Sequence, residues 1–204
     1  ARSITSSTFA DANSSLDSYI NAGNFGLGTT SPSEKLDVEG SIQIDGDYTY
    51  ETPKTSYYSV PVSEMETHQG AAAYTTIKNF TGGAPNYMYL SGGTSGSNGY
   101  CHAPVHLPHG ATVTNLKAIM YDNSAVTATV ELERVAAGSS TSMALCATST
   151  NMTSIQTIND ATIANSVVDN SIYSYALGIT GDQGGGTNLR FYHVIITYTV
   201  TKAD

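Results

Sequence analysis

The sequence has no tryptophan and few charged side chains, and basic residues are especially scarce. Only 8 of the 204 residues are Lys or Arg, against 17 Asp or Glu, which gives a formal net charge of −9. Nucleic-acid binding needs clustered cations that neutralise phosphates, so this composition argues against a nucleic-acid partner. Apolar runs of about 20 residues are also missing, and the sequence therefore predicts no membrane-embedded segment.

Hydroxyl side chains take the place of the missing charges. Ser and Thr make up 51 of the 204 residues, and only 12% of residues are charged, about half the usual ~25%. This composition is typical of secreted all-β proteins and fibres. We therefore expect an extracellular or virion location.

Cysteine is rare as well, because Cys101 and Cys146 are the only two. An even pair in an extracellular chain favours a disulfide between them. Two separate buried thiols are the alternative.

The first quarter of the chain, residues 1–54, has few large apolar side chains and cannot build a core alone. We predict that it is an N-terminal assembly segment. The spacing of Phe9, Leu16 and Ile20 predicts a short helix. After it, alternating apolar residues predict three short strands at residues 25–27, 36–38 and 42–44.

Residues 55–204 have a denser apolar pattern that predicts strands throughout and no helix of ordinary length. The expected strands are residues 57–62, 74–80, 86–90, 99–107, 112–121, 127–135, 142–148, 154–158, 171–179 and 189–200. Strands at this spacing, separated by Gly-, Pro- and Asn-rich turns, predict an all-β, jelly-roll-like β-sandwich.

The stretch FGLGTTSPSEKLDVEG, residues 25–40, resembles an element of phage tail-fibre-like proteins and bacterial surface fibre proteins, with the pattern GIGTTSPxxKLDVxG. Leu27 stands where Ile is usual. The matching residues are Gly26, Gly28, Thr29, Thr30, Pro32, Lys35, Leu36, Asp37, Val38 and Gly40. Residues 57–61, 103–113 and 168–175 are similar to a C-terminal domain that follows such elements. The resemblance implies a homotrimeric fibre with a thin stalk and a jelly-roll-like head.

The apolar residues of the N-terminal segment also suggest self-association. Three chains around an axis could bury side chains that a single chain cannot. The candidate assembly residues are Phe25, Leu27, Leu36, Val38, Ile42 and Ile44. A flexible linker is one alternative, and the other is an open, pilus-like filament in which this segment completes a neighbour's sheet by donor-strand complementation.

A thiol and three imidazoles lie close together in the sequence, at Cys101, His102, His106 and His109. Imidazoles are common zinc ligands, but this spacing matches no standard zinc pattern. We interpret the histidines as edge-strand and loop residues, and a metal site is the alternative. No cofactor is expected.

Catalytic patterns are weak, because the acidic residues are scattered and no nucleophile elbow or phosphate loop occurs. We therefore predict a non-enzymatic structural subunit of a self-assembling fibre, whose β domain contacts a receptor or a cell-surface glycan. A carbohydrate-binding module is the further alternative, because tyrosine rings can stack on sugars. The candidate tyrosines are Tyr87, Tyr89, Tyr100, Tyr121, Tyr173 and Tyr175.

Overall fold

The computed structural model describes residues 23–67, 74–81 and 84–203, and it divides the chain into two units, Ala1–Asp47 and Tyr48–Asp204. The boundary expected after residue 54 falls inside strand β3 (Thr49–Pro61) of the second unit. The helix expected around Phe9, Leu16 and Ile20 lies outside the described residues. A search for membrane-spanning helices among the described residues finds none.

The first unit contains one small parallel pair of strands, β1 (Phe25–Leu27) and β2 (Leu36–Val38). Phe25 lies opposite Leu36, and Leu27 lies opposite Val38. The two strands are joined by the loop of residues 28–35, which is short for a parallel connection. Two of the three short strands expected here are therefore present.

The third expected short strand, residues 42–44, does not form, and this prediction was wrong. Ile42 and Ile44 alternate as a strand would, but they pair with no other strand among the described residues and are 61% and 50% exposed. Alternation alone does not make a strand, because the backbone also needs a hydrogen-bonding partner.

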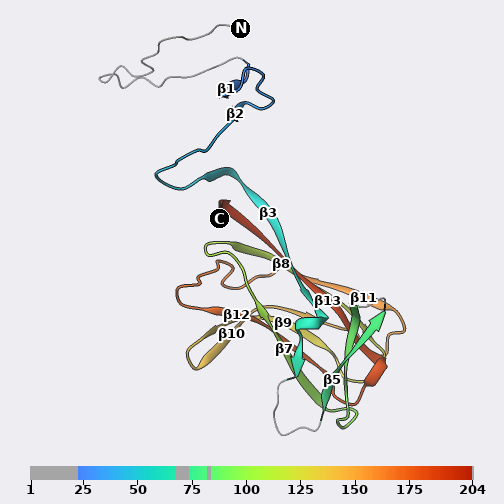
Figure 1. The fold of residues 1–204 in the computed structure, drawn as a ribbon. Helices are drawn as coiled ribbons and strands as arrows, with labels where there is room; N and C mark the ends of the chain where they lie inside the picture. Colours follow the sequence, from blue (N-terminus) through green and yellow to red (C-terminus); the bar gives the residue numbers. More distant parts are fainter. Residues whose placement is uncertain (1–22, 68–73, 82–83, 204) are drawn as a thin grey trace. The chain divides into compact units, whose positions relative to one another are not determined.

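The second unit is built from two antiparallel sheets (Figure 1). Sheet I has the order β11-β8-β13-β6-β5, and β3 also pairs with β13. Its strands are β3, β5 (Thr75–Thr81), β6 (Ala84–Ser91), β8 (Thr112–Asp122), β11 (Ile155–Asp160) and β13 (Leu189–Lys202). Sheet II has the order β10-β9-β12-β7-β4. Its strands are β4 (Glu66–Thr67), β7 (Asn98–Val105), β9 (Thr129–Ala136), β10 (Ser139–Ala147) and β12 (Ser174–Asp182).

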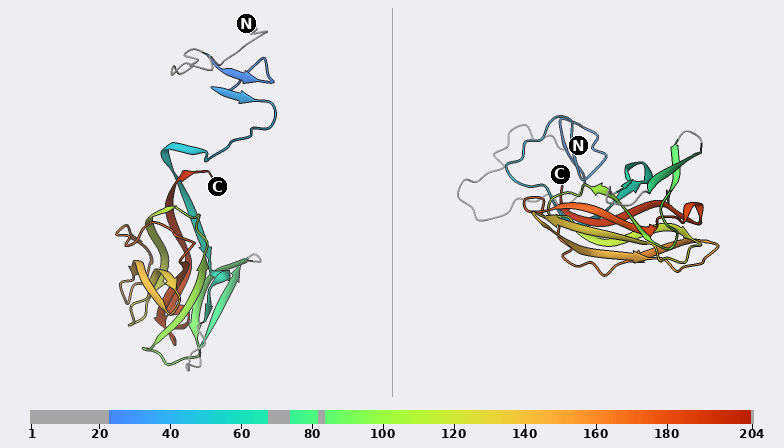
Figure 2. Two further views of the ribbon diagram at one scale, coloured as in Figure 1. Left: turned by 90° about the vertical axis from the view of Figure 1, so that its left-hand side faces the viewer. Right: turned by 90° about the horizontal axis from the view of Figure 1, so that it is seen from below.

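The chain passes back and forth between the sheets, so that neighbours within a sheet are mostly distant in sequence (Figure 2). Strands β6 to β13 form the two four-stranded halves β11-β8-β13-β6 and β10-β9-β12-β7. This is the strand order of a jelly roll. The expected all-β, jelly-roll-like sandwich is confirmed.

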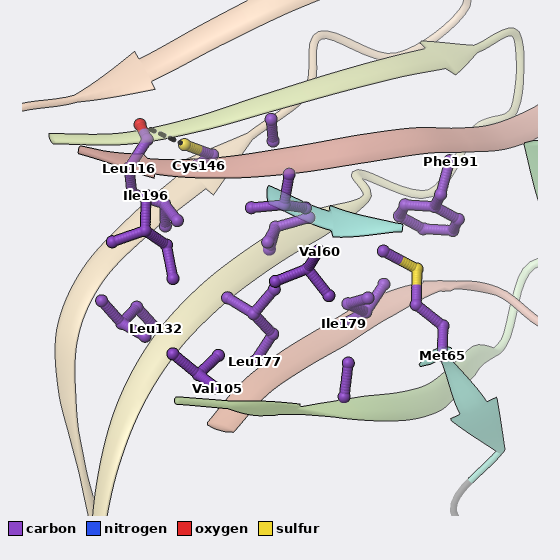
Figure 3. Close-up of a cluster of buried hydrophobic side chains, with 14 of the residues drawn as sticks. Val60, Met65, Val105, Leu116, Leu132, Cys146, Leu177, Ile179, Phe191 and Ile196 are labelled. Atoms are coloured by element: carbon purple, nitrogen blue, oxygen red, sulfur yellow. Dashed lines mark hydrogen bonds between the residues drawn. The ribbon is translucent and has the colours of Figure 1, made fainter. Parts of the chain in front are cut away.

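The core lies between the two sheets, because every second residue of the inner strands is apolar and buried. In β7 the alternation is complete, and Cys101, Ala103 and Val105 point inward. Figure 3 shows how residues of the two sheets meet there. Its labelled residues are Val60, Met65, Val105, Leu116, Leu132, Cys146, Leu177, Ile179, Phe191 and Ile196.

The ten strands expected in this unit all occur, with shifted ends. The largest shift is at β3, which begins at Thr49 rather than at residue 57, because the long C-terminal strand β13 offers it a partner up to Lys202. The two-residue strand β4 was not expected. A strand of this length has no periodicity to recognise.

Candidate functional site

The outer face of sheet II carries a shallow depression over its central strand. Along β12 the outward residues are small, namely Ala176, Gly178 and Thr180, while Leu177 and Ile179 between them fill the core. Since successive residues of a strand point to opposite faces, the same strand is bulky inside and nearly bare outside. The outer side of β12 therefore forms the floor of a groove.

Two neighbouring strands supply the walls of this groove. Gly178 lies opposite His102 of β7 on one side and Glu131 of β9 on the other. Ala176 similarly lies between Pro104 and Glu133. Thus one wall carries imidazole and proline, the other carries two carboxylates, and the strand between them leaves space.

Two adjoining hollows follow this arrangement, and we call them together the outer groove. The smaller hollow, about 340 Å³, is lined by residues of β7, β9 and β12. The larger, about 700 Å³, extends past the end of β7 to the loop before β12. His102 lines both hollows. The lining residues used below are Tyr100, His102, His106, Glu131, Glu133, Tyr173 and Gly178.

The carboxylates of Glu131 and Glu133 are the main polar groups of the outer groove. Both residues are partly buried, and a Cβ atom added to Gly178 would lie 3.3 Å from the Oε1 atom of Glu133. Neither carboxylate forms an ion pair within the described part of the chain. They are therefore available as acceptors for hydroxyl or amine donors of a ligand.

Tyr100 presents an aromatic surface at one end of the outer groove and is 50% exposed. Its backbone is held from the inside. The hydroxyl of Tyr74 donates to the carbonyl of Tyr100 and accepts from its N–H, at 3.1 and 2.7 Å. These two hydrogen bonds to the main chain fix the strand from which the Tyr100 side chain projects.

Tyr173 marks the other end of the outer groove, where the guanidinium carbon of Arg134 lies 4.6 Å from its ring centroid. Tyr175, two residues later, is buried and its hydroxyl accepts a hydrogen bond from the N–H of Asp169. Of the candidate tyrosines, Tyr100, Tyr173 and Tyr175 therefore line the outer groove, and Tyr175 also belongs to the core. Tyr87, Tyr89 and Tyr121 are on sheet I.

The histidines are not gathered into one cluster. His102 and His106 line the larger hollow, whereas His109 lies in a turn, where its Nδ1 accepts from the N–H of Asn170 at 3.1 Å. Among the described residues, no three His, Cys, Asp or Glu side chains are close enough to hold a metal ion. Cys101 points into the core, away from His102.

The expected disulfide is wrong, because Cys101 and Cys146 are both free thiols. Cys101 is on β7 and Cys146 is on β10, with β12 and β9 between them. Three strand spacings of about 4.8 Å separate the two thiols, far beyond disulfide reach. Instead, the Cys146 thiol donates to the carbonyl oxygen of Leu116 at 3.4 Å, as Figure 3 shows.

Most of the candidate assembly residues remain exposed in the first unit. Leu27, Leu36, Ile42 and Ile44 are 47%, 56%, 61% and 50% exposed. Phe25 and Val38 are partly buried. The β1–β2 pair aligns four of the six side chains and covers two of them in part.

The outer groove itself was missed by the sequence reasoning, which treated all acidic residues, Glu131 and Glu133 included, as scattered. A signal was present in the spacing of Ala176, Gly178 and Thr180, which leaves one face of a strand without bulk. That signal has meaning only once the neighbours of β12 are known, and these strands lie far from it in sequence.

No protein-family model and no curated protein matches the chain. Among solved structures, it is similar to the CBM22-2 xylan-binding domain of Paenibacillus barcinonensis Xyn10C, with 12% identity, 72% of this chain and 99% of that chain covered, and a TM-score of 0.41. A second is the CBM22-1–GH10 part of Clostridium thermocellum xylanase Xyn10B, complexed with xylohexaose, at 12% identity, 71% and 27% coverage, and a TM-score of 0.40.

A third is the family 11 carbohydrate-binding module of the cellulosomal cellulase Lic26A-Cel5E of Clostridium thermocellum, at 10% identity, 78% and 96% coverage, and a TM-score of 0.32. At such low scores and identities, function has to be argued from the residues of this chain.

Proposed function

We propose that this protein is a non-catalytic adhesion subunit, whose β domain binds carbohydrate in the outer groove and whose first unit joins copies of the chain. The observation that carries the carbohydrate assignment is the pair of carboxylates, Glu131 and Glu133, facing a glycine-floored hollow. Hydroxyl groups of sugars are donors that such carboxylates accept. The flat face of Tyr100 suits the apolar face of a sugar ring.

The shape of the outer groove favours a chain of sugars over a single one. It follows β12 from Thr180 to Ser174, a length of about 20 Å at about 3.3 Å per residue. It is open to the outside along this length, which an internal stretch of a polysaccharide requires. We therefore expect binding to an oligosaccharide and weak or no binding to a monosaccharide.

A glycan array followed by calorimetry with the full chain tests this assignment. Xylohexaose should be among the probes. For the oligosaccharide that binds, Tyr100→Ala and the double variant Glu131→Gln/Glu133→Gln should each weaken binding about tenfold, because stacking and charged hydrogen bonds each contribute about 1–2 kcal/mol. Gly178→Val should block the groove.

The matched control is Tyr57→Ala, which removes a 69% exposed tyrosine of sheet I and should leave binding unchanged. Absence of binding to any glycan at high concentration would refute the carbohydrate assignment. Release of reducing sugar from the bound oligosaccharide would refute the proposal that the protein is non-catalytic.

Self-association is supported by a separate observation, the exposure of Leu27, Leu36, Ile42 and Ile44 in a single chain. Large apolar side chains that a subunit leaves exposed close together in sequence are typical of contact surfaces. The resemblance of residues 25–40 to fibre elements adds to this. Three copies around an axis would cover these side chains, and an extracellular or virion fibre is the assembly that we propose.

Light scattering on the full chain measures the mass of the assembly. The double variant Leu36→Asp/Val38→Asp should dissociate it, while Ile155→Asp, at an equally exposed site of the β domain, should not. A mass of three chains favours the closed fibre, and a broad distribution of masses favours the donor-strand filament. If the wild-type chain is monomeric at every concentration, self-association is wrong.

A further inference from the structure

A second cluster of side chains, on the outer face of sheet I, has a chemistry opposite to that of the outer groove. Its centre is Arg190, near the start of β13. The register of the sheet places Arg190 opposite Tyr121 of β8, and Phe191 opposite Met88 of β6. Since Phe191 and Met88 point into the core, the residues beside them point outward.

The guanidinium group of Arg190 is enclosed by aromatic rings. Its carbon lies 4.8 Å from the ring centroid of Tyr121 and 5.2 Å from that of Tyr87. Tyr87 in turn has its ring centroid 5.9 Å from Tyr192 and 6.3 Å from Tyr89. We call these five residues the tyrosine–arginine cluster.

Arg190 is held in place without a carboxylate. Its Nε donates to the carbonyl oxygen of Thr187 at 2.7 Å, and its guanidinium carbon lies over the rings of Tyr87 and Tyr121. Within the described residues, no ion pair of Arg190 with a carboxylate is found. The Arg190 side chain is only partly buried.

The strand segments that supply the five residues of the cluster contain no acidic side chain. No Asp or Glu occurs from residue 67 to residue 121, a stretch that includes β6, nor anywhere in β13. Asp122 follows Tyr121 but is fully buried, and its carboxylate accepts hydrogen bonds inside the fold. The cluster therefore presents a positive charge in a chain of net charge −9.

We infer that the tyrosine–arginine cluster is a second binding site, which takes a carboxylated sugar such as a hexuronate unit. The planar guanidinium can form paired hydrogen bonds with a carboxylate. Its contacts with Thr187, Tyr87 and Tyr121 already hold it in place. The adjacent tyrosine rings offer a surface for the sugar ring. The outer groove would repel the same ligand through Glu131 and Glu133, so uronate binding reports on this cluster alone.

Calorimetry of the full chain with tetragalacturonate at low salt tests the inference. Wild-type protein should bind it, and neutral galactotetraose should not compete. Arg190→Gln should weaken binding about tenfold or more, and Arg190→Lys should also weaken it, because an ammonium group lacks the paired donors. The far-ultraviolet circular dichroism and melting temperature of each variant establish that it is folded.

Two controls separate the cluster from general electrostatic attraction. Lys117→Gln removes a cation from the same outer face, further along β8, and should change the affinity by less than twofold. Glu131→Gln/Glu133→Gln should not reduce uronate binding. Equal losses in Lys117→Gln and Arg190→Gln would overturn the inference, as would unchanged binding by Arg190→Gln. Equally tight binding of tetraglutamate would overturn the assignment to a sugar.

Discussion

The hydroxyl of Thr148 donates a hydrogen bond to the carboxylate of Asp122, 26 residues earlier in the chain. Asp122 is the last residue of β8 and Thr148 directly follows β10, so this bond joins the two sheets at one end of the sandwich. The carboxylate is fully buried, and its other partners are the N–H of Ala128 and the N–H and hydroxyl of Ser124. The buried carboxylate of Asp122 is thus satisfied by uncharged N–H and hydroxyl donors.

Removing the Thr148 hydroxyl should therefore destabilise the domain. Thr148→Val keeps the shape but deprives a buried carboxylate of a donor, at a cost of about 1–3 kcal/mol in the free energy of unfolding. Urea denaturation measures it. Thr157→Val, on an exposed position of β11, is the control and should change stability by less than about 0.5 kcal/mol. Equal effects of the two substitutions would contradict the role of the bond.

Two glycines of β12 should respond differently to alanine. In Gly181→Ala the new Cβ would meet Leu189 and Phe191, both fully buried, with Leu189 Cδ2 closer than any real contact. Such overpacking costs about 1–3 kcal/mol. In Gly178→Ala the Cβ meets only the end of the Glu133 side chain, 3.3 Å away, which can move aside. Melting temperatures should fall for the first variant and not for the second.

Both cysteines should be unreactive in the folded protein. Burial raises the pKa of the Cys101 thiol to about 12, with a smaller contribution from Glu66, and burial raises that of Cys146 to about 11. At pH 8 fewer than about one thiol in a thousand is ionised, and the thiolate is the reactive form. Ellman's reagent should react with both thiols only after unfolding in guanidinium. Rapid reaction of either thiol in the native protein would contradict this, as would an intact mass showing a disulfide.

The carboxyl group of Asp169 should titrate at a low pH. Hydrogen bonds from the side chain and the backbone N–H of Ser171 lower its pKa, and His109 adds a smaller effect. A carboxyl whose pKa is lowered by folding adds stability above its unfolded pKa, and that contribution is lost as the pH falls through the folded value. In Ser171→Ala the NMR titration midpoint of Asp169 should move upward. An unchanged midpoint would assign the shift to another group.

Alternating apolar residues were enough to predict the strands of the β domain, because a sandwich buries one face of each strand and leaves the other outside. Strand pairing was not predictable in this way. Residues 49–54 were assigned to the N-terminal segment, because that segment has few large apolar side chains. Only the pairing of β3 with β13 places them in sheet I. Conversely, Ile42 and Ile44 have the right pattern and no partner strand among the described residues.

The same holds for the candidate sites: the sequence pattern predicts the strands, but not which strands are neighbours. Cys101 and Cys146 are both on strands, as expected, but the number of strands between them decides that they cannot bond. Arg190 gave no signal in the sequence, because its tyrosines come from β6, β8 and β13. Groups of this kind depend on cross-strand neighbours, and these follow from topology.

The pairing of β3 with β13 has a mechanical consequence. The N–H of Ala203 donates to the carbonyl of Tyr48 at 2.9 Å, so the β domain begins and ends at the same place. Tension applied between these two ends would open the β3–β13 ladder one bond at a time, like a zipper. Tension between Tyr48 and a ligand held on β7 and β9 would instead pull β3 along its length and load the bonds from Lys54 to Pro61 together, in shear. A domain tethered through β3 alone would therefore resist a pulling force far better than one tethered at both ends.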